Sequence, residues 1–146
     1  MKNTVVIAND HAGTKLKFQL VPYLEDLGFK VKNLGTNSDV SVDYPDYVHP
    51  VAENLTSGDV EFGILICGSG QGVSMLANKY RDVRAAVCWE PGIASLARKH
   101  NNANVLCLPA RFLSANNAKT IVKEFLHTAF EEGRHLTRIQ KFYRFN

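Results

Sequence analysis

The chain has 146 residues, of which 45% are hydrophobic and 21% charged, and its formal net charge at pH 7 is +3. These values are typical of one globular domain with its own core, and they exclude a disordered chain. The first apolar run, residues 5–8, is too short for a signal peptide, and no run approaches the ~20 apolar residues of a membrane span. We therefore expect a single domain over residues 1–146, without a membrane segment and located in the cytoplasm.

Short apolar runs alternate with helical periodicity along the chain. The first strand is followed by a helix whose leucines recur at spacings of four and three until Gly28 ends it. The region after Gly133 is predicted to be irregular or to extend away. The predicted strands cover residues 5–8, 29–34, 62–67, 84–88 and 104–108, and the predicted helices cover 16–27, 48–55, the glycine loop to 79, 93–100 and 114–130.

Strands separated by helices imply right-handed crossovers and a parallel sheet that helices cover on both faces. We predict a doubly wound α/β fold, a Rossmann-like three-layer sandwich around a five-stranded parallel sheet. In such folds ligands bind beyond the carboxyl ends of the strands. A pocket is therefore expected where four polar loops begin: Asn9-Asp10-His11, Cys67 to Gly72, Trp89-Glu90 and Pro109-Ala110-Arg111.

The loop after the third strand combines a thiol with closely spaced glycines. Gly68, Gly70 and Gly72 lack a Cβ, so the backbone N–H groups can approach an anionic atom, and Cys67 stands at the mouth of this nest. Taken alone, Cys67 is also compatible with an inert buried cysteine. The glycine spacing does not match dinucleotide-binding or P-loop motifs, and no arginine follows the thiol as a cysteine phosphatase would require.

The other cysteines, Cys88 and Cys107, occupy separate apolar runs. The three thiols show no metal-ligand spacing, and their odd number fits a reducing compartment. We expect no disulfide and no metal site.

Basic residues are concentrated near the end of the chain, where Arg134 and Arg138 are four residues apart. Three interpretations are open: a solvated face, a small-anion site and a nucleic-acid contact. A nucleic-acid binder would show a broader basic stripe or a recognisable module. On the residues alone a solvated face is favoured over a small-anion site, and we expect no nucleic-acid partner.

Six motifs follow one another in order from end to end of the chain. They are Asn9-Asp10-His11-Ala12-Gly13, Asp43-Tyr44-Pro45-Asp46, Cys67-Gly68-Ser69-Gly70-Gln71-Gly72, Ala77-Asn78-Lys79, His100-Asn101-Asn102-Ala103-Asn104-Val105-Leu106 and Gly133-Arg134-His135. Together they resemble the type B ribose-5-phosphate isomerases, a family shared with galactose-6-phosphate isomerase subunits and allose-6-phosphate isomerases.

The resemblance implies an aldose–ketose isomerase that works through an enediolate without metal or organic cofactor. It also implies a homodimer with shared active sites, and pairing of dimers into a tetramer is left open. The segment 133–146 carries large apolar side chains, among them Phe142, Tyr143 and Phe145, whose exposure to water is unfavourable. We expect this segment to pack on a partner subunit.

The resemblance also assigns roles by position. Cys67 matches the catalytic base and His100 the acid that opens the sugar ring. One branch of the family uses a glutamate as base, but this chain has Val73 at that position, so it belongs with the cysteine branch. The catalytic set is Cys67, His100, Ser69 and Asp10; the substrate-binding set is Asp10, His11, Tyr44, Gly68, Ser69, Gly70, Gln71, Gly72, Asn101, Arg111, Arg134 and Arg138.

The chemistry of these residue types agrees with the assigned roles, but Ser69 and His100 each have an alternative role. Ser69 can shuttle a proton between two oxygens or cap the following helix. Histidine is the residue type best suited to act as a ring-opening acid, although His100 on its own would be interpreted as a surface histidine at a helix end. Permanently charged arginines suit a phosphate.

Three positions depart from the family pattern: Trp89 is larger than usual, Glu132 replaces a glycine, and Leu108-Pro109-Ala110 leads unusually into Arg111. We expect them to affect pocket size and hence the sugar. The predicted reaction interconverts ribose 5-phosphate and ribulose 5-phosphate. The alternatives are isomerisation of a six-carbon sugar phosphate, allose or galactose 6-phosphate, and a non-catalytic sugar-phosphate sensor.

Overall fold

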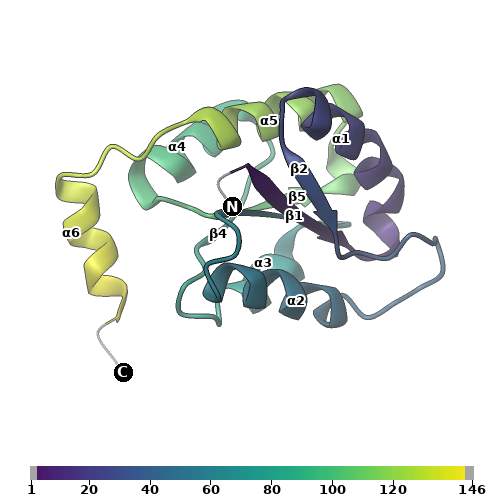
Figure 1. Ribbon diagram of the computed structural model, residues 1–146, viewed down its shortest axis with the longest axis horizontal. Coiled ribbons are helices and arrows are strands. Elements are labelled where there is room, and N and C mark those ends of the chain that lie inside the picture. Colours follow the sequence, from purple (N-terminus) through teal and green to yellow (C-terminus); the bar gives the residue numbers. More distant parts are fainter. Residues whose placement is uncertain (1–2, 144–146) are drawn as a thin grey trace.

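The computed structural model describes residues 3–143. Within this range, five parallel strands form one sheet in the order β2-β1-β3-β5-β4. Helices cover both faces of the sheet, which confirms the predicted Rossmann-like sandwich (Figure 1). The strands are β1 (Thr4–Asn9), β2 (Lys30–Asn33), β3 (Phe62–Cys67), β4 (Ala85–Val87) and β5 (Val105–Pro109).

The helices form two layers, each with its own core. One layer holds α1 (Thr14–Asp26), α4 (Pro91–Asn101) and α5 (Ala115–His127), and the other holds α2 (Pro45–Thr56) and α3 (Gln71–Ala77) (Figure 1). No helix within residues 3–143 is both long and apolar enough to cross a lipid bilayer.

Both faces of the central strands are buried, so their side chains alternate between the two cores. In β3, Ile64 and Ile66 face the α1/α4/α5 layer, while Leu65 and Cys67 face the α2/α3 layer. This alternation directs the Cys67 thiol toward the layer that contains α3. The glycine loop leads directly into that helix.

Two segments near the end of the chain differ from the sequence prediction. The helix predicted to reach residue 130 ends at His127, where the next residue, Thr128, is extended and its carbonyl accepts a hydrogen bond from Arg98 Nε at 3.2 Å. The region after Gly133, predicted to be irregular, forms the short helix α6 (Arg134–Gln140). It packs on α4, and His135 and Ile139, one turn apart, are buried.

In Figure 1, α6 stands apart from the two helical layers, at the side of the molecule near α4. Arg144 and Phe145, which belong to the segment predicted to meet a partner, lie outside the described residues.

The turn into α6 contains a strained residue. Glu132 has φ +62°, in the left-handed region, directly before Gly133 at φ +57°. A side chain with a Cβ is disfavoured there by about 1–2 kcal/mol. Its position is the one where the family pattern has glycine.

We predict that Glu132→Gly stabilises the protein by about 0.5–1 kcal/mol, because relief of strain exceeds the added entropy of the unfolded chain. The measurement is the urea midpoint of unfolding. The matched control is Asn102→Gly at φ +46°, where the Asn102 side chain accepts a hydrogen bond from Arg98 Nη1 at 2.9 Å. The control variant should lose stability; a loss in Glu132→Gly as well would contradict the strain argument.

Candidate active site

The thiol of Cys67 lies at the carboxyl end of β3, where the glycine loop begins. The Cys67 side chain is only 6% exposed, and its Sγ accepts a hydrogen bond from the Gly70 backbone N–H at 3.1 Å. Gly70 has φ +73°, a left-handed conformation that turns its amide back toward the sulfur. A backbone N–H is therefore aimed at the sulfur at the point where the chain enters α3.

The other two cysteines lie in different surroundings. Burial raises the pKa of Cys88 to about 12. The pKa of Cys107 is also raised, first by its complete burial and then by the neighbouring thiols. Both are therefore uncharged at neutral pH.

Gly68 and Gly72 make room for two side chains from distant parts of the chain. A Cβ on Gly68 would lie 2.9 Å from Arg111 Nη1, and a Cβ on Gly72 would lie 2.6 Å from Tyr44 Cζ. Arg111 is also tied to the loop by its backbone N–H, which donates to the Gly68 carbonyl at 3.1 Å. The glycine loop thus lies between a guanidinium and a phenol, both in the predicted substrate-binding set.

Ser69 and Gln71 complete the loop. Ser69 Oγ accepts a hydrogen bond from the Gln71 N–H at 3.3 Å. Gln71 is the first residue of α3. The N-cap of α3 is Gly70, so Ser69 lies one residue before the cap and bonds the first amide of the helix.

Asp10 and His11 follow β1 at the same edge of the sheet. The Asp10 N–H donates to the Ile66 carbonyl at 3.1 Å, which holds this turn beside Cys67, and its Oδ1 accepts from the Ala12 N–H at 2.9 Å. His11 Nδ1 accepts a hydrogen bond from the Val42 N–H at 3.2 Å. Because a backbone N–H can only donate, Nδ1 is unprotonated, and in neutral His11 the proton is on Nε2.

A buried lysine that the sequence analysis did not single out supports the segment leading to Tyr44. Lys17 is fully buried, and its ammonium donates to the Thr36 carbonyl and, at 2.7 Å, to Asn37 Oδ1. Burial lowers the pKa of Lys17. Its spacing from the buried Leu20 and Leu24, three and seven residues, is the sequence signal that could have placed it on the buried face of α1.

The rest of the predicted site lies at the opposite end of the sheet. The helix α4 runs from the carboxyl end of β4 back to the amino end of β5, so His100 and Asn101 are at the amino edge. Arg84, which precedes β4, donates through Nε to the Asn101 carbonyl at 3.1 Å. Arg134 and Arg138 lie on α6, which packs on α4.

One chain therefore brings together Asp10, His11, Tyr44, the loop 67–72 and Arg111. It keeps His100, Asn101, Arg134 and Arg138 away from Cys67, in a separate cluster beside α6.

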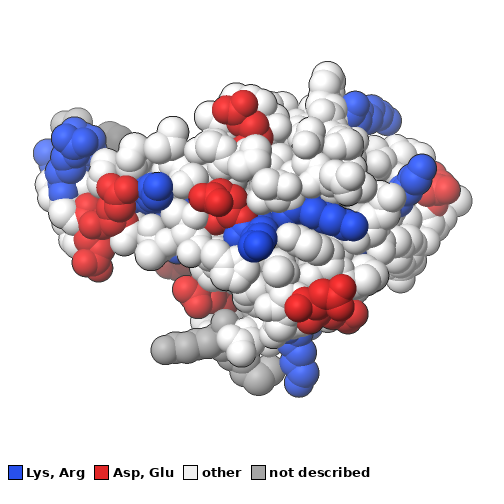
Figure 2. Space-filling model, turned by 90° about the horizontal axis from the view of Figure 1, so that it is seen from above, with Lys and Arg blue, Asp and Glu red and all other residues white. Residues whose placement is uncertain are grey.

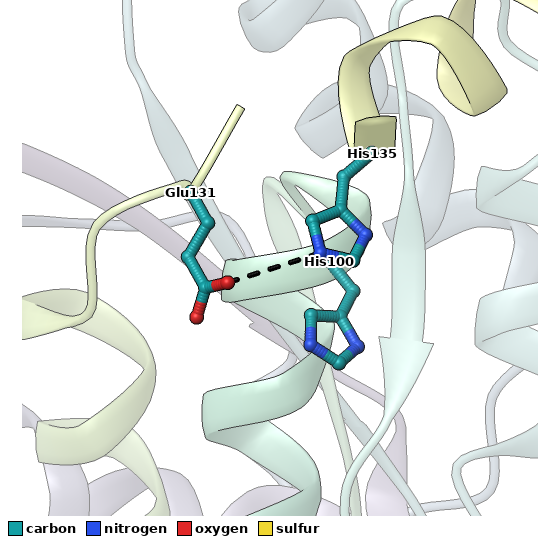
Figure 3. A group of neighbouring side chains, drawn as sticks. All are labelled: His100, Glu131 and His135. Carbon is teal, nitrogen blue, oxygen red and sulfur yellow. Dashed lines mark ion pairs between the residues drawn. The ribbon is translucent and has the colours of Figure 1, made fainter. Parts of the chain in front are cut away.

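His100 has a neighbour that the predicted site set omits. Its ring stacks on that of His135, with centroids 4.3 Å apart and planes at 11° (Figure 3). The pKa of His135 is lowered, first by loss of solvation and then by the charges of His100 and Arg134. Glu131 Oε2 lies 3.8 Å from His135 Nε2 and acts in the opposite direction.

The face of the molecule seen in Figure 2 carries acidic and basic side chains interspersed with one another. Lys and Arg side chains, drawn in blue, also lie at the left end of this view, on the side where Figure 1 places α6. Mixed charge of this kind is typical of a solvated surface rather than of a nucleic-acid-binding face.

The fold is that of an α/β protein, and the candidate ligand site is at the carboxyl ends of its strands, where ligands bind in this class of fold. Residues 5–142 match the family model described as Ribose/Galactose Isomerase. Over 147 aligned residues the chain is 44% identical to a probable ribose-5-phosphate isomerase B of Mycoplasma genitalium, covering 99% of this chain and 97% of that one. It is also 44% identical to ribose-5-phosphate isomerase B of Escherichia coli, covering 90% and 88%.

Solved structures agree. A ribose 5-phosphate isomerase from Thermotoga maritima superimposes with a TM-score of 0.95 at 48% identity, covering 97% of this chain and 98% of that one. Ribose-5-phosphate isomerase B from Mycoplasma genitalium with bound ribulose-5-phosphate gives a TM-score of 0.91 at 45% identity, covering 97% and 94%. The chain belongs to the ribose/galactose isomerase family, as its motifs predicted, and is an isomerase.

We predict that Gly72→Ala displaces Tyr44 and raises the KM of the isomerase reaction about 2–13-fold, because one hydrogen bond to the substrate contributes about 0.5–1.5 kcal/mol. The melting temperature should change little, because the outer end of the Tyr44 ring can rotate away. In a Tyr44→Ala background the same substitution should have no further effect on KM. An unchanged KM in Gly72→Ala alone would show that Tyr44 does not contact the substrate.

Proposed function

We propose that this protein interconverts ribose 5-phosphate and ribulose 5-phosphate through an enediolate, in the cytoplasm and without a metal or organic cofactor. The observation that carries the proposal is the Cys67 thiol, held by the Gly70 N–H at the mouth of a glycine loop. The bound ribulose-5-phosphate of a relative 45% identical over nearly the whole chain supports the choice of substrate.

In this mechanism Cys67 is the general base. Its thiolate removes the proton from C2 of the open-chain aldose, and the electron pair of the broken C–H bond forms the C1–C2 double bond of the enediolate. The charge that develops on the C1 oxygen is stabilised by backbone N–H groups of the loop. Ser69 shuttles a proton between the two oxygens, and the Cys67 thiol returns its proton to C1.

The phosphate and the closed sugar ring need the remaining residues. Arg111, which lies against Gly68, is one phosphate ligand, and Arg134 and Arg138 are two more because their spacing of four places them on one face of α6. His100 donates the proton that opens the ring. Asp10, His11 and Asn101 orient the sugar hydroxyls and the phosphate.

A complete site then requires a second copy of the chain, because His100, Asn101, Arg134 and Arg138 are at the opposite edge of the sheet from Cys67. The segment around α6 has a surface for such a contact. His135 and Ile139 are buried against α4, whereas Leu136 is 41% and Phe142 57% exposed. Apolar side chains left exposed in this way favour association.

A two-fold dimer in which each chain supplies α6 and the end of α4 to its partner would complete both sites at once. In this arrangement residues 1–146 form one domain, whose segment 133–146 packs on the partner. The dimer is sufficient for catalysis, and assembly into a tetramer is not required.

A six-carbon substrate is the second candidate, because Trp89, 55% exposed, follows β4 at the same edge of the sheet as Cys67 and bears on the length of sugar accepted. A sensor that binds sugar phosphate without turnover needs no thiol at the loop. Turnover therefore decides among the three functions.

We predict turnover of ribose 5-phosphate with higher kcat/KM than allose 6-phosphate or galactose 6-phosphate. Cys67→Ala should lower kcat by at least ~10²-fold, the low end for general-base catalysis, while substrate still binds. The control is Cys88→Ala, which removes a thiol of raised pKa and should keep kcat within a few fold.

Near-normal kcat in Cys67→Ala would contradict its role as the base. Preference for a six-carbon sugar phosphate would select the second candidate. Binding of all three sugar phosphates without any turnover would leave the sensor function.

A further inference from the structure

Three side chains that are typical metal ligands meet away from the thiol loop. His100 comes from the last turn of α4, His135 from the first turn of α6, and Glu131 from the segment that leads into α6. One ligand atom from each lies within 4.8 Å of the other two. In Figure 3 the carboxylate of Glu131 faces the same edge of both stacked rings.

The backbone holds this cluster together. The Glu131 N–H donates to the Lys99 carbonyl at 3.1 Å, so the segment before α6 is fastened beside the end of α4. Among the described residues, the ion pair of His135 with Glu131 is the one polar side-chain contact made by either imidazole ring. The ring nitrogens on the carboxylate side are therefore available as ligands.

We propose that His100, Glu131 and His135 bind one divalent transition-metal ion, with zinc the best fit, and that the bound ion is inhibitory because it engages His100. Two imidazole nitrogens and one carboxylate oxygen form a ligand set that suits zinc, and they leave its fourth position to water. Magnesium and calcium, which prefer oxygen ligands, fit poorly. The ion is a reversible inhibitor here and has no part in the chemistry of isomerisation.

The geometry requires a small adjustment. Zinc bonds of ~2.0–2.2 Å place the ligand atoms of a tetrahedral site about 3.3 Å apart, so the rings must tilt from their parallel stack and Glu131 must move inward. Glu131 can do so, because its side chain is 50% exposed. Arg134 and Arg138 on the same helix repel a cation, so we expect binding that a chelator reverses.

Metal binding itself does not depend on the proposed function, whereas the inhibition rests on it, through the role given to His100. No sequence spacing marks this cluster, because Glu131 lies before α6 rather than on it, and His100 is 31 positions before Glu131 in the chain.

The test uses the full chain after treatment with a chelator. One titration adds Co²⁺ and monitors visible absorption, and a second adds Zn²⁺ and measures the heat of binding by calorimetry. We expect one ion per chain, the strong visible bands of four- or five-coordinate Co²⁺, and displacement of Co²⁺ by Zn²⁺. Glu131→Gln and His135→Asn should each weaken binding at least ~10-fold, since each removes one of three ligands. His127→Asn, which replaces an exposed histidine on α5, is the matched control and should leave the affinity for the metal ion unchanged.

Equal affinity in the wild type and in Glu131→Gln, a substitution of an exposed side chain that preserves its shape, would overturn the site. So would a sulfur-to-cobalt charge-transfer band, which would assign the ion to a cysteine. In a separate activity measurement, Zn²⁺ should reduce turnover in proportion to occupancy, and Glu131→Gln should need at least ~10-fold more Zn²⁺ for the same reduction.

Full turnover at full occupancy would overturn the inhibition. The absence of turnover in metal-free wild-type protein would instead contradict the proposed function, because the spectra report binding without it.

Discussion

The direction of the chain through its parallel sheet determines where the functional residues can lie. Each helix that joins two parallel strands must return from the carboxyl edge of the sheet to the amino edge. A residue at the carboxyl end of a strand is therefore separated from a residue at the end of a crossover helix by the length of the sheet. Cys67 is of the first kind and His100 of the second. No rearrangement of side chains within one chain can join them.

The same constraint explains how the carboxyl edge is built. Asp10, Cys67 and Arg111 lie at the carboxyl ends of three adjacent strands, β1, β3 and β5, so the sheet places them side by side. The side chains of Tyr44 and Arg111 then lie against the glycine loop, because Gly72 and Gly68 have no Cβ that would clash with them. The loop is thus shaped by its neighbours as much as by its own conformational freedom.

Sequence periodicity was enough to predict the sandwich, because strands buried on both faces and helices with leucines at spacings of three and four are strong local signals. It failed for α6, whose seven residues make only two turns and bury two side chains. The end of α5 was also misplaced, because the carbonyl of Thr128 is bound by Arg98 from another helix.

Some features of the candidate site could likewise be predicted from local sequence, whereas others depend on residues that are distant in the chain. The thiol, the glycines and the polar strand ends could be read from local pattern, and the family motifs added the arginines and His100. The steric need for Gly68 and Gly72 depends on Arg111 and Tyr44, which are far from them in sequence. The stacking of His100 on His135 depends on the docking of α6 on α4, which no local pattern reveals.

The central claim is that Cys67 of one chain acts with His100 of another. The most direct test mixes two inactive proteins, Cys67→Ala and His100→Ala, under conditions that exchange subunits. Random exchange makes half of the dimers mixed, each with one intact site of two, so activity should recover to about a quarter of the wild-type value. If both residues acted within one chain, every site in the mixture would stay broken, and the absence of any recovered activity would contradict the account.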